Sequence, residues 1–161
     1  MSVNQSTGRS GDTRAKGYRI ALVCARFNDV IVSGLEQGAR RALLDNGARA
    51  ADVTTVWVPG AWEIPMAARQ LAASGRFDAI VALGCVIRGE TYHFEVIADQ
   101  SNAGLMQLAM QTGVVVTTGI LTVESNQQAH ERVGGRHGHK GAEAALAAVE
   151  TLNAVRSTLG A

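Results

Sequence analysis

The chain has 161 residues, a length typical of one domain that closes a single core. Apolar residues make up 47% of it and aromatic residues only 4%, so aliphatic side chains must build that core. A formal net charge of +1 argues against a nucleic-acid partner, which requires an excess of basic residues on one face. No apolar stretch reaches the length of a membrane span.

Two features indicate the compartment and the domain boundary. Cys24 and Cys85 both lie in apolar runs, and two such cysteines are typical of buried free thiols in a reducing cytosol, so we expect a cytoplasmic protein. Residues 1–17 are polar and charged and lack the apolar middle of a signal peptide. We expect them to form a disordered arm outside one domain that spans residues 18–161.

Apolar runs of strand length alternate with longer stretches of helical period. Strands are predicted at residues 19–25, 52–58, 78–87 and 114–122. The first helix is expected between a cap at Asn28 or Asp29 and a stop at Asn46 and Gly47, and later helices at residues 61–73, 94–111, 125–133 and 141–159. This alternation predicts one α/β domain with a parallel sheet and helices on both faces.

In such a sheet, ligands bind outside the carboxyl ends of the strands. The segments that follow the first three strands place Phe27, Glu63 and His93 there, an aromatic ring, a carboxylate and an imidazole. Each has a plain alternative: Phe27 could pack over the rim of the core, Glu63 could complement a helix dipole, and His93 could be a surface or capping residue. Their convergence on one rim favours a ligand site.

A metal site is not expected. His130, His137 and His139 follow no zinc-binding spacing, and the glycines among them indicate a turn. The chain also lacks the motifs of a P-loop, a dinucleotide-binding fold and a serine hydrolase.

Residues 84–95, which read GCVIRGETYHFE, resemble the signature of the lumazine synthase family. Further stretches agree with that family in order and spacing: residues 26–28 (RFN), 59–65 (PGAWEIP), 119–122 (GILT), and 128–132 leading to Lys140 and Gly141. The resemblance covers residues 18–157. It implies a flavodoxin-like three-layer sandwich whose four parallel strands lie in the order 2-1-3-4, with helices on both faces.

The resemblance also implies an activity and an assembly. A lumazine synthase is a transferase that condenses 5-amino-6-(D-ribitylamino)uracil with 3,4-dihydroxy-2-butanone 4-phosphate. It forms 6,7-dimethyl-8-ribityllumazine and releases phosphate and water, the penultimate step of riboflavin biosynthesis. No cofactor is implied. The family forms homopentamers with the pocket between neighbouring subunits, and the turn at residues 134–141 has the length of members that build icosahedral shells. The resemblance also suggests riboflavin synthase as a partner.

The residue roles that the resemblance implies fall into two groups. In the first, Phe27 stacks on the pyrimidine, Glu63 accepts hydrogen bonds from ribityl hydroxyls, and the backbone of residues 85–87 reads the pyrimidine edge. The residues carried over for the uracil substrate are Phe27, Ala61, Trp62, Glu63, Cys85, Val86, Ile87 and Thr118. Thr118 stands where many members carry a large aromatic, which leaves one wall of the pocket thinner.

The second group serves the butanone phosphate and the chemistry. Glu90 and Thr91 match phosphate-binding positions, where only the N–H of Glu90 suits an anion. Arg132 matches the charge-assisted clamp, Lys140 lies near the phosphate, and His93 matches the proton-transfer residue. Position 139 is His where Asn is common, a departure just before Lys140.

Three alternatives stay open at this point. A flavodoxin-type flavin carrier is disfavoured because the loop after the first strand lacks the expected Ser, Thr and Gly residues. The related archaeal riboflavin synthase is disfavoured by GETYHF, residues 89–94. A purely structural shell protein is disfavoured by His93 and Arg132 in their motif context.

Overall fold

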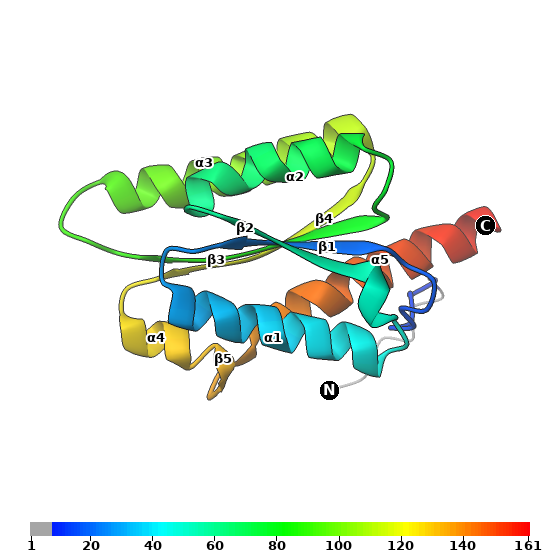
Figure 1. Cartoon of the computed structure of the whole chain (residues 1–161), viewed down its shortest axis with the longest axis horizontal. Coiled ribbons are helices and arrows are strands. Elements are labelled where there is room, and N and C mark those ends of the chain that lie inside the picture. Colours follow the sequence, from blue (N-terminus) through cyan, green and yellow to red (C-terminus); the bar gives the residue numbers. More distant parts are fainter. Residues whose placement is uncertain (1–7) are drawn as a thin grey trace.

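A four-stranded parallel sheet forms the centre of the computed structural model, which describes residues 8–161 (Figure 1). Its strands are β1 (Ile20–Ala25), β2 (Val53–Val58), β3 (Ala79–Ile87) and β4 (Val115–Val123), in the order β2-β1-β3-β4. This confirms the predicted strand order. All four strands run the same way, so their carboxyl ends meet at one edge of the sheet.

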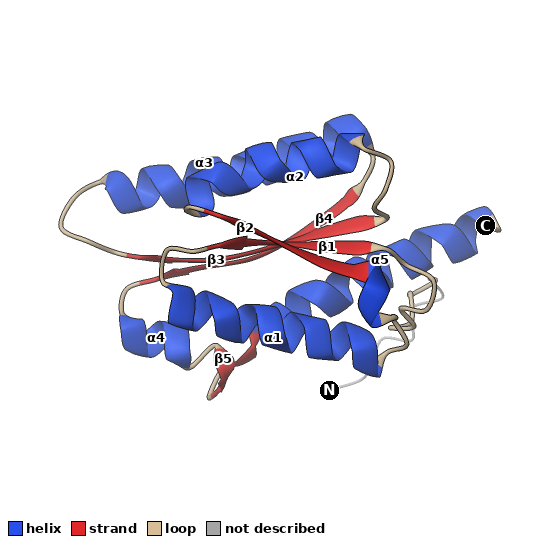
Figure 2. Cartoon of the chain, viewed as in Figure 1, coloured by secondary structure: helices blue, strands red, loops and turns tan. Residues whose placement is uncertain are grey.

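Helices cover both faces of the sheet (Figure 2). Helices α2 (Ile64–Ala73) and α3 (His93–Thr112) lie on one face. Helices α1 (Asp29–Asp45), α4 (Asn126–His130) and α5 (Lys140–Leu159) lie on the other. None of the helices within residues 8–161 has the length and apolar character that a membrane span needs.

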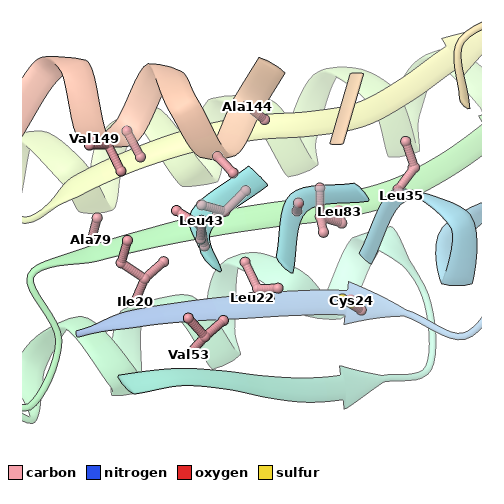
Figure 3. Packing of buried hydrophobic residues seen from close by; sticks show 14 of the residues in the cluster. Ile20, Leu22, Cys24, Leu35, Leu43, Val53, Ala79, Leu83, Ala144 and Val149 are labelled. Carbon is pink, nitrogen blue, oxygen red and sulfur yellow. The ribbon is translucent and has the colours of Figure 1, made fainter. Parts of the chain in front are cut away.

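The sheet separates two aliphatic clusters because alternate side chains of a strand point to opposite faces. Leu22 and Leu83 pack with Leu35 of α1 and Val149 of α5, all fully buried (Figure 3). Each such side chain contributes about 1.5–3 kcal/mol by leaving water. Val23 and its neighbours on the opposite face pack against α2 and α3.

The segment predicted as one helix over residues 61–73 is divided. A 3-10 turn, Ala61–Glu63, precedes α2, and Pro65 stands in the first turn of that helix. Proline has no N–H to donate to Ala61, so the α-helical ladder cannot extend back through this point. The division holds Ala61, Trp62 and Glu63 at the carboxyl end of β2.

The helix predicted at residues 125–133 is shorter than expected. Helix α4 ends at His130, and a small hairpin follows, formed by β5 (Val133–Gly135) and β6 (Gly138–His139). Gly134 and Gly138 have φ angles of +83° and +79°, which other residues adopt only with strain, so the chain turns here instead of continuing a helix.

The described part of the polar arm differs from the expectation. Ala15 is fully buried in the core, and its N–H donates to the carbonyl of Asn46. Asn153 of α5 donates its side-chain amide to the carbonyls of Asp12 and Arg14. Residues 8–17 therefore lie against α1 and α5, a result of side-chain partners distant in sequence. Residues 1–7 fall outside the described part of the chain. A short 3-10 turn, Ala50–Asp52, leads into β2.

Candidate active site

A cavity of about 670 Å³ opens at the carboxyl ends of β1, β2 and β3. The lining comes from the loops after these strands and from the first turns of α3: residues 27–28, 59–63, 85–87, 89, 91, 93–94 and 96–97. This is the edge of the sheet where the sequence predicted a ligand site. In Figure 1 the carboxyl end of β3 is the one from which the long loop to α3 leaves.

Two aromatic side chains in the cavity are strongly exposed, Phe27 at 74% and Trp62 at 55%. Phe27 therefore does not pack over the core rim, the alternative considered for it. The loops that carry these rings are joined, because the N–H groups of Arg26 and Phe27 donate to the carbonyls of Val58 and Pro59. The two loops are thus held together, and both rings remain accessible to a ligand.

Asn28 connects the first loop to β3. It has a left-handed backbone, with φ 62° and ψ 47°, and its side-chain amide donates to the carbonyl of Cys85 at 2.8 Å. It stands at the helix start, as expected, but no cap hydrogen bond forms from its side chain. Instead the Asn28 amide orients the carbonyl of Cys85, which belongs to residues 85–87, the segment predicted to hydrogen-bond the edge of the pyrimidine.

Cys85 contributes its backbone to the cavity more than its thiol. Its side chain is 4% exposed, and burial raises the pKa of the thiol to about 11. The thiol is therefore protonated at neutral pH and is not a nucleophile. Cys24 is likewise buried and free, as predicted, and burial raises its pKa to about 12.

Glu63 closes the turn in which it stands and also lines the cavity. Its Oε2 accepts a hydrogen bond from the N–H of Gly60 at 2.9 Å, which closes the 3-10 turn. The same carboxylate lines the cavity. The turn therefore holds an acceptor group in place before any ligand arrives.

His93 begins α3 and lines the cavity with an exposed side chain. Thr91 lines it as well, while Glu90, between the lining residues Gly89 and Thr91, is exposed and is not part of the lining. The hydroxyl of Thr91 is 3.4 Å from the N–H of His93, so the loop and the helix start are in contact.

Arg88 fixes the loop that leads to His93. Its guanidinium pairs with Glu95, donates from Nε to Glu124 at 2.7 Å and lies 4.5 Å from the ring centre of Phe94. The pair with Arg88 holds the pKa of the Glu95 carboxyl below its usual range. Because two carboxylates neutralise it, Arg88 anchors the loop to β4 and is poorly placed as an anion ligand.

Three predicted residues lie away from this cavity. Thr118 is exposed on the edge strand β4, where its hydroxyl donates to Asn102 at 2.8 Å. Arg132 and Lys140 flank the β5–β6 hairpin on the α1 side of the sheet, joined by a hydrogen bond from the N–H of Lys140 to the carbonyl of Arg132 (Figure 2). The cavity lining found within residues 8–161 includes no lysine or arginine.

Residues 17–156 match the family described as 6,7-dimethyl-8-ribityllumazine synthase. The chain belongs to the lumazine synthase family. Curated relatives bear the same name: one from Xylella fastidiosa (strain 9a5c) is 50% identical over 147 residues, 91% of this chain and 96% of the relative. Another from Gemmatimonas aurantiaca is 46% identical over 144 residues, 89% of this chain and 88% of the relative.

Family membership decides between the open alternatives. The chain has lumazine synthase activity and belongs to riboflavin biosynthesis, which excludes a flavin carrier and a purely structural shell protein. The resemblance in residues 84–95 is thereby confirmed. The individual residue roles stay predictions.

The histidines near the hairpin form no metal site in the described chain. Within residues 8–161, no three His, Cys, Asp or Glu side chains come together as metal ligands. His137 lies 3.8 Å from Glu131, and His139 contacts the backbone of α1 and α5.

Sequence reasoning missed the contributions of Asn28 and Arg88. Asn28 was considered only as a cap, although asparagine at a strand-to-helix turn tolerates the left-handed backbone found here. Arg88 belongs to the signature, but its partner Glu124 is 36 residues away in the chain, so only the fold reveals the contact.

Replacing Asn28 tests whether its amide organises the site. Asn28→Gly keeps the left-handed backbone but removes the donor to Cys85. We expect a KM for the ribitylaminouracil that is raised about 2- to 10-fold, the loss of one hydrogen bond, with little change in thermal unfolding. Asn28→Ala should raise KM and also lower stability by about 1 kcal/mol, because alanine is strained at this φ. An unchanged KM in the glycine variant would show that the contact with Cys85 does not organise the site.

Proposed function

We propose that the cavity binds the ribitylaminouracil, with Phe27 stacked on the pyrimidine ring. The exposed ring of Phe27, facing a cavity that also holds Glu63 and His93, is the observation that carries this proposal. Ala61 and Trp62 form the adjoining wall, and Glu63, fixed by Gly60, accepts hydrogen bonds from ribityl hydroxyls. The backbone of residues 85–87 pairs with the polar edge of the pyrimidine.

His93 is the proton-transfer residue in this proposal. The 5-amino nitrogen of the uracil attacks the ketone carbon of the butanone phosphate and gives a carbinolamine, which loses water to form an imine. Phosphate is eliminated, and the ribityl-bearing nitrogen closes the second ring with loss of another water. These steps move protons but require no change of oxidation state. Imidazole is the side chain most often used as a general acid and base, and holding the two substrates together lowers the entropic barrier.

The phosphate half of the site needs cations that the cavity of one chain does not supply. The loop with Glu90 and Thr91 offers backbone N–H groups and a hydroxyl, and Glu90 is exposed and is not among the residues that line the cavity. We propose that Arg132 and Lys140 of a neighbouring copy complete this half, and that Thr118 of that copy closes the pyrimidine wall. All three are outside the cavity of their own chain.

A pentamer whose pockets lie between subunits satisfies this requirement. Exposed methionines on α2 and α3 support such an interface: Met66 is 65%, Met106 66% and Met110 78% exposed in the single chain. Large apolar side chains that gather on an exposed surface are typical of a contact with another protein, and we propose that these three belong to such a contact. The short β5–β6 hairpin carries no insertion, so we propose that the pentamers close into an icosahedral shell.

His93→Ala tests the proton-transfer role. We expect kcat to fall on the order of 10²-fold, since general acid–base catalysis contributes at least that much, while proximity leaves a residual rate. His130→Ala, at the exposed end of α4, is the matched control and should keep wild-type kinetics. Steady-state formation of the lumazine, followed by absorbance, measures both. Equal activity in the two variants would remove His93 from the mechanism.

Arg132→Ala tests the phosphate clamp. Loss of a charge-assisted hydrogen bond should raise the KM for the butanone phosphate about 10- to 100-fold. The KM for the ribitylaminouracil should stay near the wild-type value. Arg136→Ala, exposed in the same hairpin, removes an equal charge and should change neither constant. A rise confined to the uracil substrate would reverse the assignment of the two halves.

The assembly is tested by the mass of the purified protein in light scattering and by electron microscopy. A closed shell should contain about sixty chains in particles of uniform diameter. Particles of five chains alone would refute the shell and leave the pentamer standing, whereas stable monomers would refute both.

A further inference from the structure

The imidazole of His139 lies between α1 and α5 and contacts the backbone of both. Its Nδ1 accepts a hydrogen bond from the N–H of Ala142 at 3.2 Å, so the ring caps the start of α5. Its Nε2 lies 3.1 Å from the carbonyl oxygen of Gly34 in α1. An amide N–H can only donate and a carbonyl can only accept, so the network assigns a neutral ring with its proton on Nε2.

Two glycines of α1, Gly34 and Gly38, allow the β5–β6 hairpin to approach the helix closely. A Cβ atom added at Gly38 would lie 2.0 Å from Cε1 of His139, and one added at Gly34 would lie 2.6 Å from Cγ1 of Val133. Neither distance is sterically possible, so both glycines are needed for the observed approach. The hairpin therefore packs directly on α1, where Val133 lies against Gly34 and the His139 ring lies against Gly38.

The position of His139 fixes two cationic residues. Lys140 follows it directly and donates its N–H to the carbonyl of Arg132 at 2.9 Å. Val133, next to Arg132, pairs with His139 across the hairpin. His139 is therefore linked through the backbone to both ends of the hairpin, where Arg132 and Lys140 lie.

We propose that His139 is a positioning residue for the phosphate half of the site: by locking the hairpin onto α1, it sets the places of Arg132 and Lys140. This inference rests on the proposed role of those two residues toward the butanone phosphate. His139 itself does not touch substrate. Its effect is therefore on affinity for one substrate and not on the proton transfers.

Gly38→Ala displaces the ring without altering His139 or any residue assigned to the site. We expect the KM for the butanone phosphate to rise about tenfold, while kcat and the KM for the ribitylaminouracil stay within about twofold. Gln37 is exposed on the same helix next to Gly38, so Gln37→Ala is the matched control and should leave kcat and both KM values unchanged. His139→Ala should show the same split as Gly38→Ala.

Two further variants separate positioning from general stability. His139→Asn keeps an acceptor for the N–H of Ala142 and should recover most of the affinity that His139→Ala loses. In the double variant Gly38→Ala with His139→Ala, no ring is left to displace, so the two effects should not add. Additive effects, or an equal decline in kcat and in both KM values, would overturn the proposal. If His139→Ala does not fold, Gly38→Ala and His139→Asn still decide it.

Arg132→Ala, assayed alongside, distinguishes a failure of the positioning role of His139 from a failure of the proposed phosphate clamp. If it raises the KM for the butanone phosphate and Gly38→Ala does not, His139 has no positioning role and the proposed phosphate clamp stands. If Arg132→Ala leaves that KM unchanged, the clamp is wrong and the positioning role of His139 is overturned with it.

Discussion

A phosphate group bound in an apolar pocket needs cationic partners, and the cavity of a single chain places none in its lining among residues 8–161. Arg88 is nearby, but Glu95 and Glu124 neutralise it and use it to hold the loop after β3. The cations carried over from the family resemblance, Arg132 and Lys140, flank the β5–β6 hairpin on the α1 side of the sheet. This separation is the reason for the proposal that the site is shared between copies of the chain. The exposed side chains of Met66, Met106 and Met110 on α2 and α3 are consistent with a contact there.

The pocket that does form within one chain depends on the parallel sheet. Because β1, β2 and β3 end at the same edge, Phe27, Glu63 and His93 come together from three distant parts of the sequence. Short backbone contacts then fix them: Arg26 and Phe27 bond to Val58 and Pro59, and Asn28 reaches Cys85. The site is therefore organised before substrate binds, as proximity catalysis requires.

The sequence predicted features governed by local pattern. Apolar runs such as residues 78–87 identified buried parallel strands, and the family resemblance supplied their order. The sequence did not predict that Pro65 would separate a 3-10 turn from α2. Nor did it predict that the hairpin after α4 would pack on Gly34 and Gly38 of α1. The burial of Ala15 was also missed, because its partner Asn46 lies on another element. In each case a contact between distant residues decides the local structure.

For the site, the sequence placed residues at the correct edge of the sheet, and their roles toward substrate stay predictions. Phe27, Trp62 and Thr91 line the cavity. The contacts of Asn28 with Cys85 and of Arg88 with Glu124 join residues far apart in the chain, so only the fold reveals them. Arg132 and Lys140 match their motif positions, and Thr118 stands where many members carry an aromatic, but none of the three lines this cavity. A motif match gives the place of a residue in the sequence and does not say which copy of the chain it would serve.

Subunit mixing tests the shared site most directly. His93→Ala and Arg132→Ala chains are unfolded together and reassembled, then assayed at a low concentration of butanone phosphate beside each variant treated alone. If each site combines His93 of one chain with Arg132 of another, an equal random mixture restores about one intact site in four, and the activity rises well above that of either variant. If both residues serve the same chain's site, no intact site can form. Activity equal to the mean of the two variants would then contradict the account.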